Sequence, residues 1–336
     1  MNTPTDEPRT GTDDSSPGLR RARRVSAGLM LASLAVLGIL IYVGADFDLR
    51  ELASLLAQVS PGLILTLLLL SCVNFALRSG RWIGFSHALG LVVPWRQNTT
   101  CYLGGFAMGV TPGRLGELIR LWLLRRDYEI SYHRALPLMI GDRISDLVAV
   151  VVLALVAGLL TTGAPLPAVL AAAGLVVLAN VTLRHPGYLI TAVDGLYGLT
   201  RRAPRLFAAA RRTLKTGRVL FSASNSFIAG LTSLAAWFAE CLAFFLLLTA
   251  LGTGISLPTA TFIYSFATLI GALSFLPGGL GGFEATAVVL LSAQGLDLGA
   301  AAVATTLIRL TTLWFSVAVG SAVLTWSMLG KKLARA

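Results

Sequence analysis

Residues 111–117 read Thr-Pro-Gly-Arg-Leu-Gly-Glu, and residues 276–284 read Leu-Pro-Gly-Gly-Leu-Gly-Gly-Phe-Glu. Both stretches contain Pro-Gly-x-Leu-Gly followed by a glutamate, and both interrupt an apolar segment, at about 98–126 and 259–294. Proline removes a backbone donor and glycine tolerates unusual backbone angles, so each motif is expected to break a helix. Inside a membrane the freed backbone groups must be satisfied by protein or by a water-filled cavity. The two motifs therefore predict two broken helices that line a cavity.

The two motifs occupy matching places in a longer pattern. A Leu-Gly pair and then a proline precede each motif, and an arginine follows the glutamate of each motif by 26 or 25 residues. The matched residues are Leu89, Gly90 and Pro94 with Leu251, Gly252 and Pro258, and Glu117 and Arg143 with Glu284 and Arg309. Three matches in the same order predict a repeat, with copies at about 61–160 and 226–328. Inverted repeats with broken segments are a common way for transporters to build a site near mid-membrane.

The composition is typical of an integral membrane protein. Of the 336 residues, 55% are hydrophobic and 13% are charged, whereas a soluble domain carries about 25% charged residues. The formal net charge is +11, but the Lys and Arg residues lie between and beside apolar runs. We interpret them as topology determinants and contacts with anionic lipid headgroups, and we expect no nucleic-acid partner. The sequence thus predicts an all-α, polytopic membrane protein.

Unbroken apolar runs long enough to cross the hydrocarbon core predict about six full transmembrane helices. They lie at about 27–45, 61–85, 134–160, 166–183, 226–250 and 300–328. Basic clusters lie between them, at 20–24, 78–134, 184–218 and 331–335, and the positive-inside rule places such clusters in the cytoplasm. Six spans put all four clusters on one side only if the two broken segments are re-entrant hairpins, the first from the cytoplasmic and the second from the outer side. The alternative is eight spans, with the central basic loop outside.

The chain is expected to form one membrane domain, over residues 20–330, after a disordered cytoplasmic tail at 1–19. Residues 184–222 carry eight Lys and Arg residues against a single acid, Asp194, and are predicted to be a basic cytoplasmic loop. We expect a multi-pass protein of the plasma membrane with both termini in the cytoplasm. Isolated cysteines and histidines, and no nucleotide-binding motif, lead us to expect no cofactor and no metal.

Ionisable side chains inside spans are costly and are therefore candidates for substrate binding. A helix that begins after a break also points its N–H groups inward and favours an anion such as a lipid phosphate. The alternative is structural ion pairing, of Arg143 with Asp146, or of Arg309 with Glu284 or Glu240. Arg78 and Arg81 are weaker candidates, because both are expected to snorkel to the cytoplasmic interface. The candidates are Arg114, Glu117, Arg120, Asp142, Arg143, Asp146, Glu240, Glu284 and Arg309, with the break residues Pro112, Gly113, Gly116, Pro277, Gly278, Gly279, Gly281 and Gly282.

Three stretches resemble the lysylphosphatidylglycerol synthase transmembrane-region family, which corresponds to the flippase domain of multiple peptide resistance factors. They are T-P-G-R-L-G-E-L-I-R at 111–120, D-R-I-S-D-L at 142–147 and L-P-G-G-L-G-G-F-E at 276–284. The resemblance covers about residues 27–330 and implies translocation of a modified phospholipid between leaflets. By position it nominates Pro112, Arg114, Gly116, Glu117, Asp142, Arg143, Pro277, Gly278, Gly281 and Glu284. Because the chain ends at Ala336, we expect it to lack the soluble aminoacyl-transfer domain of the full-length synthases and not to be an enzyme of that kind.

Three functions follow from these expectations. The first is a lipid flippase or transporter, whose partners are membrane phospholipids, anionic or aminoacylated. The second is a non-catalytic membrane partner of a separate synthase or glycosyltransferase, which would dock on the loop at 184–222. The third is an intramembrane lipid-modifying enzyme, but the sequence contains no visible nucleophile–base pair for it.

Overall fold

The computed structural model describes residues 59–111, 117–162, 174, 178 and 181–333. Every regular element among these residues is helical. The predictions for the tail at 1–19, the first span at 27–45 and most of the span at 166–183 lie outside the described residues. So do four candidate site residues, Pro112, Gly113, Arg114 and Gly116.

Four helices of the described chain are long and apolar enough to cross a membrane. They are α3 (Pro61–Ala88), α6 (Tyr132–Thr162), α10 (Ala223–Ala250) and a last helix in three parts, α13 (Leu298–Arg309), a π-helical turn (Leu310–Trp314) and α14 (Phe315–Leu333). These four confirm the spans predicted at 61–85, 134–160, 226–250 and 300–328.

Helices α3 and α10 are built alike from their sequences. Each has 28 residues and begins after a serine that caps it, because the hydroxyl of Ser60 accepts from Leu63 N and that of Ser222 from Asn225 N. A serine at this position satisfies one of the free N–H groups of the first turn. Each helix ends two residues before a glycine in the left-handed region, Gly90 (φ 66°) or Gly252 (φ 69°), where a residue without Cβ is favoured.

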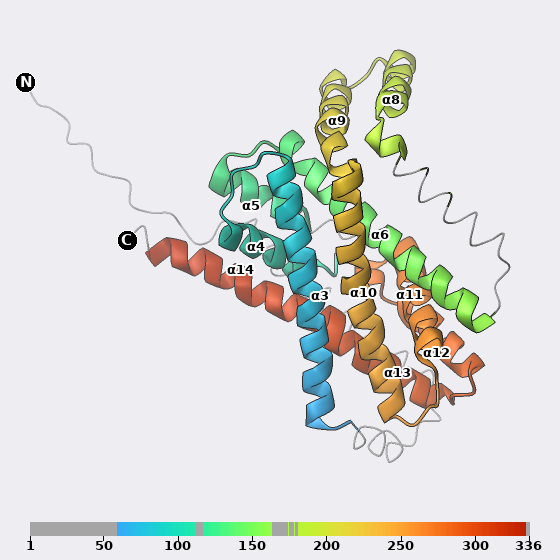
Figure 1. The fold of residues 1–336 in the computed structure, drawn as a ribbon. Helices are drawn as coiled ribbons and strands as arrows, with labels where there is room; N and C mark the ends of the chain where they lie inside the picture. The colour runs from blue at the N-terminus through green and yellow to red at the C-terminus, as the bar shows by residue number, and fades with distance from the viewer. Residues whose placement is uncertain (1–58, 112–116, 163–173, 175–177, 179–180, 334–336) are drawn as a thin grey trace, which may run out of the picture.

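The long helices run in both directions along the bundle (Figure 1). In that view α3 rises, and α10 descends beside it. The two helices are joined by a hydrogen bond from Asn74 Nδ2 to Ala236 O at 2.9 Å. Helix α6 also descends from the upper end. The helices α8 (Gly187–Thr200) and α9 (Pro204–Gly217) form a hairpin above it, at the position of the predicted basic loop.

The described parts of the first broken segment lie near the upper end of the bundle. This segment comprises α4 (Trp95–Gly104), a 3₁₀ turn (Gly105–Met108) and α5 (Ile119–Tyr128); it lies beside the upper half of α3, and α6 follows it in the chain. A hydrogen bond from Arg134 Nη2 to Gly90 O, at 3.4 Å, joins its two ends.

The second broken segment lies between the lower ends of α10 and α13 (Figure 1). It comprises α11 (Leu257–Leu273), a 3₁₀ turn (Pro277–Gly279) and α12 (Gly282–Ala293). Helix α11 rises toward the middle of the bundle, and the chain turns back there at the Pro-Gly motif. The second motif therefore interrupts a helix, as the sequence predicted for 259–294. In the segment at 98–126, α4 ends at Gly104 and α5 begins at Ile119, but most of the first motif lies outside the described residues.

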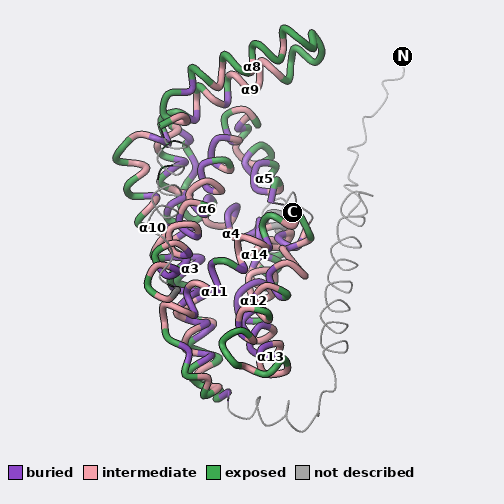
Figure 2. Tube along the Cα trace, turned by 90° about the vertical axis from the view of Figure 1, so that its right-hand side faces the viewer, coloured by how far each residue is buried: buried purple, intermediate pink, exposed green. Residues whose placement is uncertain are grey.

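Buried side chains form two clusters, one around the second broken segment and one around the first. Figure 2 shows buried residues along the centre of the bundle. Helix α14 crosses the first broken segment so closely that a Cβ on Gly320 would lie 2.4 Å from Ala107 N and 2.8 Å from Leu103 O. Many large apolar side chains instead point outward, Leu65, Leu160 and Leu231 among them, as in a protein surrounded by lipid tails.

Candidate functional site

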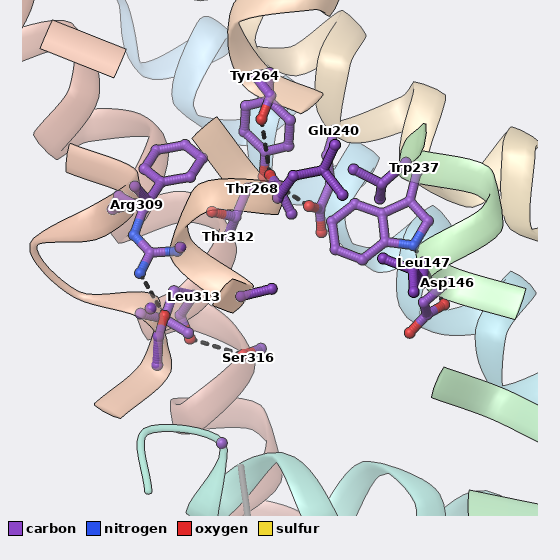
Figure 3. A pocket seen from close by; sticks show the side chains of 18 of the residues that line it. Asp146, Leu147, Trp237, Glu240, Tyr264, Thr268, Arg309, Thr312, Leu313 and Ser316 are labelled. Atoms are coloured by element: carbon purple, nitrogen blue, oxygen red, sulfur yellow. Dashed lines mark hydrogen bonds between the residues drawn. The ribbon is translucent and has the colours of Figure 1, made fainter. Parts of the chain in front are cut away.

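A cavity of about 280 Å³ lies between the two broken segments, bounded by α3, α6, α10 and the last helix (Figure 3). Its walls are apolar and aromatic for the most part. Six ionisable side chains interrupt them, three cationic and three acidic: Arg78, Arg143, Arg309, Glu117, Asp146 and Glu240. Charged groups this deep in apolar helices are expected only at a bundle interior or a polar cavity.

The structure brings five of the predicted substrate-binding residues to this cavity, Glu117, Arg143, Asp146, Glu240 and Arg309. Two predicted break residues, Gly278 and Gly279, also line it. The other described candidates lie behind the walls; they are Arg120, Asp142, Glu284, Pro277, Gly281 and Gly282. The sequence motifs far apart in the chain therefore meet at one site.

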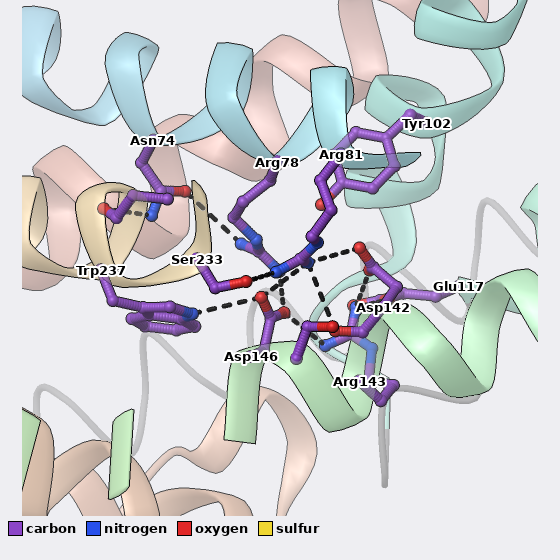
Figure 4. A network of polar contacts seen from close by, with 12 residues as sticks. Asn74, Arg78, Arg81, Tyr102, Glu117, Asp142, Arg143, Asp146, Ser233 and Trp237 are labelled. Carbon is purple, nitrogen blue, oxygen red and sulfur yellow. Dashed lines mark hydrogen bonds and ion pairs between the residues drawn. The ribbon is translucent and has the colours of Figure 1, made fainter. Parts of the chain in front are cut away.

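A buried network of charges forms the upper wall (Figure 4). Helix α6 places Asp142 and Asp146 one turn apart on one face, and α3 places Arg78 and Arg81 against them. Asp146 binds Arg78 Nη2 at 2.5 Å and Arg81 Nη2 at 2.8 Å. Asp142 binds Arg81 Nη2 at 2.5 Å. The hydroxyl of Ser233, on α10, accepts from Arg81 Nη1, so the network joins three spans.

The expectation that Arg78 and Arg81 snorkel to the interface is wrong. Their residues are only 5% and 4% exposed, and both side chains turn into the bundle. Their i, i+3 spacing places them on the face of α3 that meets the carboxylates of α6. A buried ion pair satisfies the guanidinium groups at that depth, which the sequence of α3 alone does not reveal.

Arg120 extends the network toward the first broken segment. Its side chain is fully buried, with Nε donating to Tyr102 O at 3.1 Å and the guanidinium over the Tyr102 ring at 4.1 Å. Nη1 lies 3.3 Å from Glu117 Oε2 and 3.4 Å from Asp142 Oδ2. Arg120 therefore holds α5 to the network from behind the cavity wall.

Arg143 is the most exposed arginine of the network, with a side-chain exposure of 27%. Its Nη2 donates to Glu117 Oε2, while Asp146 Oδ2 lies 3.9 Å from its Nη1. The predicted pair of Arg143 with Asp146 thus exists as a long contact, and Glu117 is the closer partner. The pairing joins the end of the first motif to α6.

The second motif is fastened by a similar pair. Arg309 Nε donates to Glu284 Oε1 at 2.7 Å, and Nη2 donates to Gly278 O at 2.8 Å. Glu284 Oε2 accepts from Gly281 N at 2.7 Å. Of the two predicted partners of Arg309, the structure therefore selects Glu284. Together the contacts clasp the backbone of the break, whose glycines have φ values of 62° to 83° at Gly278, Gly279 and Gly281.

Glu240 has a different partner, because Tyr264 donates its hydroxyl to Glu240 Oε2 at 2.6 Å. Trp237, one turn earlier on α10, donates Nε1 to Asp146 Oδ1 at 3.2 Å. Sequence reasoning missed both Tyr264 and Trp237. The one available signal was that Trp237 shares a helix face with Glu240 at i, i+3.

The last helix contains a π-helical turn beside the cavity, directly after Arg309. Thr312 and Leu313 of this turn line the cavity. The hydroxyl of Ser71, on α3, donates to Thr311 O at 2.8 Å, so one carbonyl of the widened turn has a partner across the bundle. Such turns are frequent at functional sites. In the parts of the chain that the structure describes, no three His, Cys, Asp or Glu side chains gather to hold a metal.

Residues 29–320 match the family described as lysylphosphatidylglycerol synthase TM region, and the chain belongs to that family. The chain is 26% identical over 317 residues to a UPF0104 membrane protein of Methanothermobacter thermautotrophicus, an alignment that covers 88% of this chain and 93% of that protein. It is 25% identical over 330 residues to glycosyltransferase AglD of Haloferax volcanii, which covers 86% of this chain and 52% of AglD. This chain thus spans about half the length of AglD. The family predicted from the motifs is confirmed over nearly the same residues.

Proposed function

We propose that the protein is a flippase-like transporter that moves a phospholipid or a lipid-linked substrate between the two leaflets of its membrane. One observation carries this proposal: the charged residues of both halves of the chain meet at one cavity inside the bundle. Such a cavity receives a polar headgroup while the acyl chains stay in the surrounding lipid, against outward-facing leucines such as Leu65 and Leu231.

Basic residues favour a topology with the upper end of Figure 1 in the cytoplasm. The stretches described at the lower end, 59–65, 155–162, 250–256 and 294–298, contain no Lys or Arg, and the α8–α9 hairpin with its basic residues lies at the upper end. In this topology the two broken segments are re-entrant hairpins from opposite faces. With the predicted spans at 27–45 and 166–183, the proposal has six full crossings of the plasma membrane and places both termini in the cytoplasm.

A reporter that is active only outside the cytoplasm tests this topology. Fused after Gly295 it should be active, and fused after Thr213 it should be silent. The reverse pattern would exclude the six-span arrangement.

The residues of the cavity wall support an inverted repeat. Counted from the first residue of each helix, Phe75 and Arg78 of α3 occupy the same positions as Trp237 and Glu240 of the antiparallel α10. Four cavity-lining residues of α6 each have a cavity-lining counterpart 166 residues later, in the last helix. The pairs are Arg143 and Arg309, Asp146 and Thr312, Leu147 and Leu313, and Val150 and Ser316. Figure 3 shows Asp146 on one wall and Thr312 on the other.

Two related halves around one site are the arrangement in which rocking of one half against the other exposes the site to each side in turn. The sequence contains no nucleotide-binding motif, so the proposed transport is downhill or coupled to an ion. The acids that would carry the coupling are Asp142, Asp146, Glu240 and Glu284, which lie in or directly behind the cavity walls.

Lipid translocation in liposomes tests the function. The purified full chain is reconstituted with a panel of headgroup-labelled lipids, the label of the outer leaflet is quenched, and the protected fraction is followed over time. We expect headgroup-dependent translocation by the wild type, and its loss in Arg143→Ala and Glu284→Ala variants that still fold. Arg126→Gln is the matched control, because Arg126 pairs with its neighbour Asp127 outside the cavity. No translocation of any lipid by the wild type would contradict the proposal.

A second candidate function is a non-catalytic membrane partner of a separate glycosyltransferase or synthase. It is favoured by the similarity to about half of a protein named as a glycosyltransferase. The docking surface would be the α8–α9 hairpin, where Arg201, Arg202 and Arg205 are exposed. This function predicts that a soluble enzyme copurifies with the chain and is lost when these three residues are changed to Gln. Copurification that survives the change would exclude the hairpin as the docking surface.

A further inference from the structure

The arginines that line the cavity differ in whether their Nε donor is used. Arg309 donates from Nε to Glu284 and from Nη2 to Gly278 O, at 2.7 and 2.8 Å, and its guanidinium lies over the Phe283 ring. The backbone clasp therefore uses Nε and Nη2 of Arg309.

Arg143 and Arg78, on the opposite wall, keep unused donors. Arg143 makes one hydrogen bond, from Nη2 to Glu117; its Nη1 lies 3.9 Å from Asp146 Oδ2, and its buried Nε has no hydrogen-bond partner. Arg78 is bound through Nη2 to Asp146, and its Nη1 reaches Asn74 Oδ1 only at 3.5 Å. Arg78 is 95% buried, and its Nε also has no hydrogen-bond partner.

The charged network of the upper wall has one more cation than acid before Glu240 is counted. Its described part contains four guanidinium groups and three carboxylates, a formal charge of +1, from Arg78, Arg81, Arg120, Arg143, Glu117, Asp142 and Asp146. Among the described residues, Glu240 on α10 is the one further acid that lines the cavity; it accepts from Tyr264 and brings the formal sum to zero. Buried donors without a partner are costly, and a buried cation needs a counter-charge.

We infer that Arg78 and Arg143 form a binding subsite for a phosphate group at the upper wall of the cavity. The planar guanidinium binds phosphate oxygens through two parallel hydrogen bonds, and Nε is among the donors that such a fork uses. Glu117 occupies Arg143 when the subsite is empty, and an incoming phosphate competes with it. The inference deepens the proposed function, on which it rests, because it names the chemistry of the headgroup and the wall that receives it.

Binding measurements on the full chain test the subsite. The protein is purified in a neutral maltoside detergent and titrated with dihexanoyl-phosphatidylglycerol, with dihexanoylglycerol, which lacks the phosphate, and with inorganic phosphate. We expect the phospholipid to bind, inorganic phosphate to compete with it, and the phosphate-free lipid not to bind. Affinity for phospholipid well above that for inorganic phosphate assigns the site to a lipid headgroup, and equal affinity assigns it to the free anion.

The variants decide whether these two arginines hold the phosphate. Arg143→Gln and Arg78→Gln should each weaken binding by at least about tenfold, while Arg126→Gln should not change it. Size-exclusion profiles and thermal unfolding in detergent establish which variants fold. Unchanged affinity in folded Arg143→Gln and Arg78→Gln proteins would overturn the inference.

Glu117→Gln provides a test with the opposite sign. Because it removes the carboxylate that competes for Arg143, it should strengthen phosphate binding, whereas loss of a purely structural contact would weaken it. A weakened affinity in a folded Glu117→Gln protein would count against the competition.

The binding assay and the translocation assay test the subsite and the proposed transport separately, so that one can be contradicted without the other. Translocation that is unaffected by Arg143→Gln would contradict the proposed subsite but not the proposed transport. Phosphate binding without any translocation would support the subsite and contradict the proposed transport.

Discussion

The two ends of the cavity carry the same ion pair in different surroundings. At the lower end, Arg309 and Glu284 bind each other and the backbone of one break, through Arg309 Nε and Nη2 and Gly281 N. At the upper end, Arg143 and Glu117 belong to a network with three more arginines and two aspartates. The position of Arg78 on α3 corresponds to Glu240 on α10, so one pair of equivalent positions has opposite charges. The comparison suggests that the pair fastens each break, while the added charges at one end bind ligand.

The largest expected effect comes from breaking the network at the upper end. Asp146→Asn keeps the side-chain volume but leaves Arg78 and Arg81 without their shared carboxylate. Removing one partner of a buried ion pair costs roughly 3–5 kcal/mol of unfolding free energy. Thermal or denaturant unfolding of the purified protein in detergent measures it. Wild-type stability in the variant would mean that water, rather than Asp146, satisfies the two arginines.

A smaller effect is expected from breaking the clasp at the lower end. Arg309→Gln and Glu284→Gln should each destabilise the protein, because each removes the same pair. The double variant should be less destabilised than the sum of the two, with a coupling of about 0.5–3 kcal/mol in a double-mutant cycle. Additive losses of unfolding free energy would show that Arg309 and Glu284 act independently. They would contradict the view that an ion pair fastens the second break as one fastens the first.

The smallest expected effect concerns the packing that holds the first break in place. Gly320→Ala places a Cβ against the backbone of Leu103 and Ala107 and should cost roughly 1–3 kcal/mol, as overpacking does. Gly230→Ala in α10 is the control, because a Cβ there meets no other atom within 4 Å. Equal stability of the two variants would contradict the close crossing of α14 over the first broken segment.

The sequence predicted the fold where the signal is local. Long apolar runs predicted the four described spans, and Pro-Gly motifs predicted the broken segments, because each depends on residues adjacent in the chain. The spacing of Glu117 from Arg143 and of Glu284 from Arg309 also predicted two related pairs, and the structure places both pairs in contact.

What failed depends on which helix faces meet. Arg78 and Arg81 lie near the end of an apolar run, where snorkelling is the ordinary expectation, and only the approach of α6 places Asp142 and Asp146 beside them. Tyr264 is one of five hydroxyl-bearing residues of α11, and nothing in its local sequence indicates that it binds Glu240. Side-chain pairs between helices far apart in the chain are set by packing, which local periodicity does not encode.

The central claim is that the substrate headgroup passes through the cavity between the two ends, and modification of a single cysteine in its wall tests that claim directly. Cys72, Cys101 and Cys241 are first replaced, and Thr268→Cys is introduced on the wall formed by α11. A charged thiol reagent is then applied to the reconstituted protein, and lipid translocation is followed. The account predicts that modification of Thr268→Cys blocks translocation, while the same reaction at an outward position, Leu231→Cys, has no effect. Unchanged translocation by a fully modified Thr268→Cys protein would contradict it.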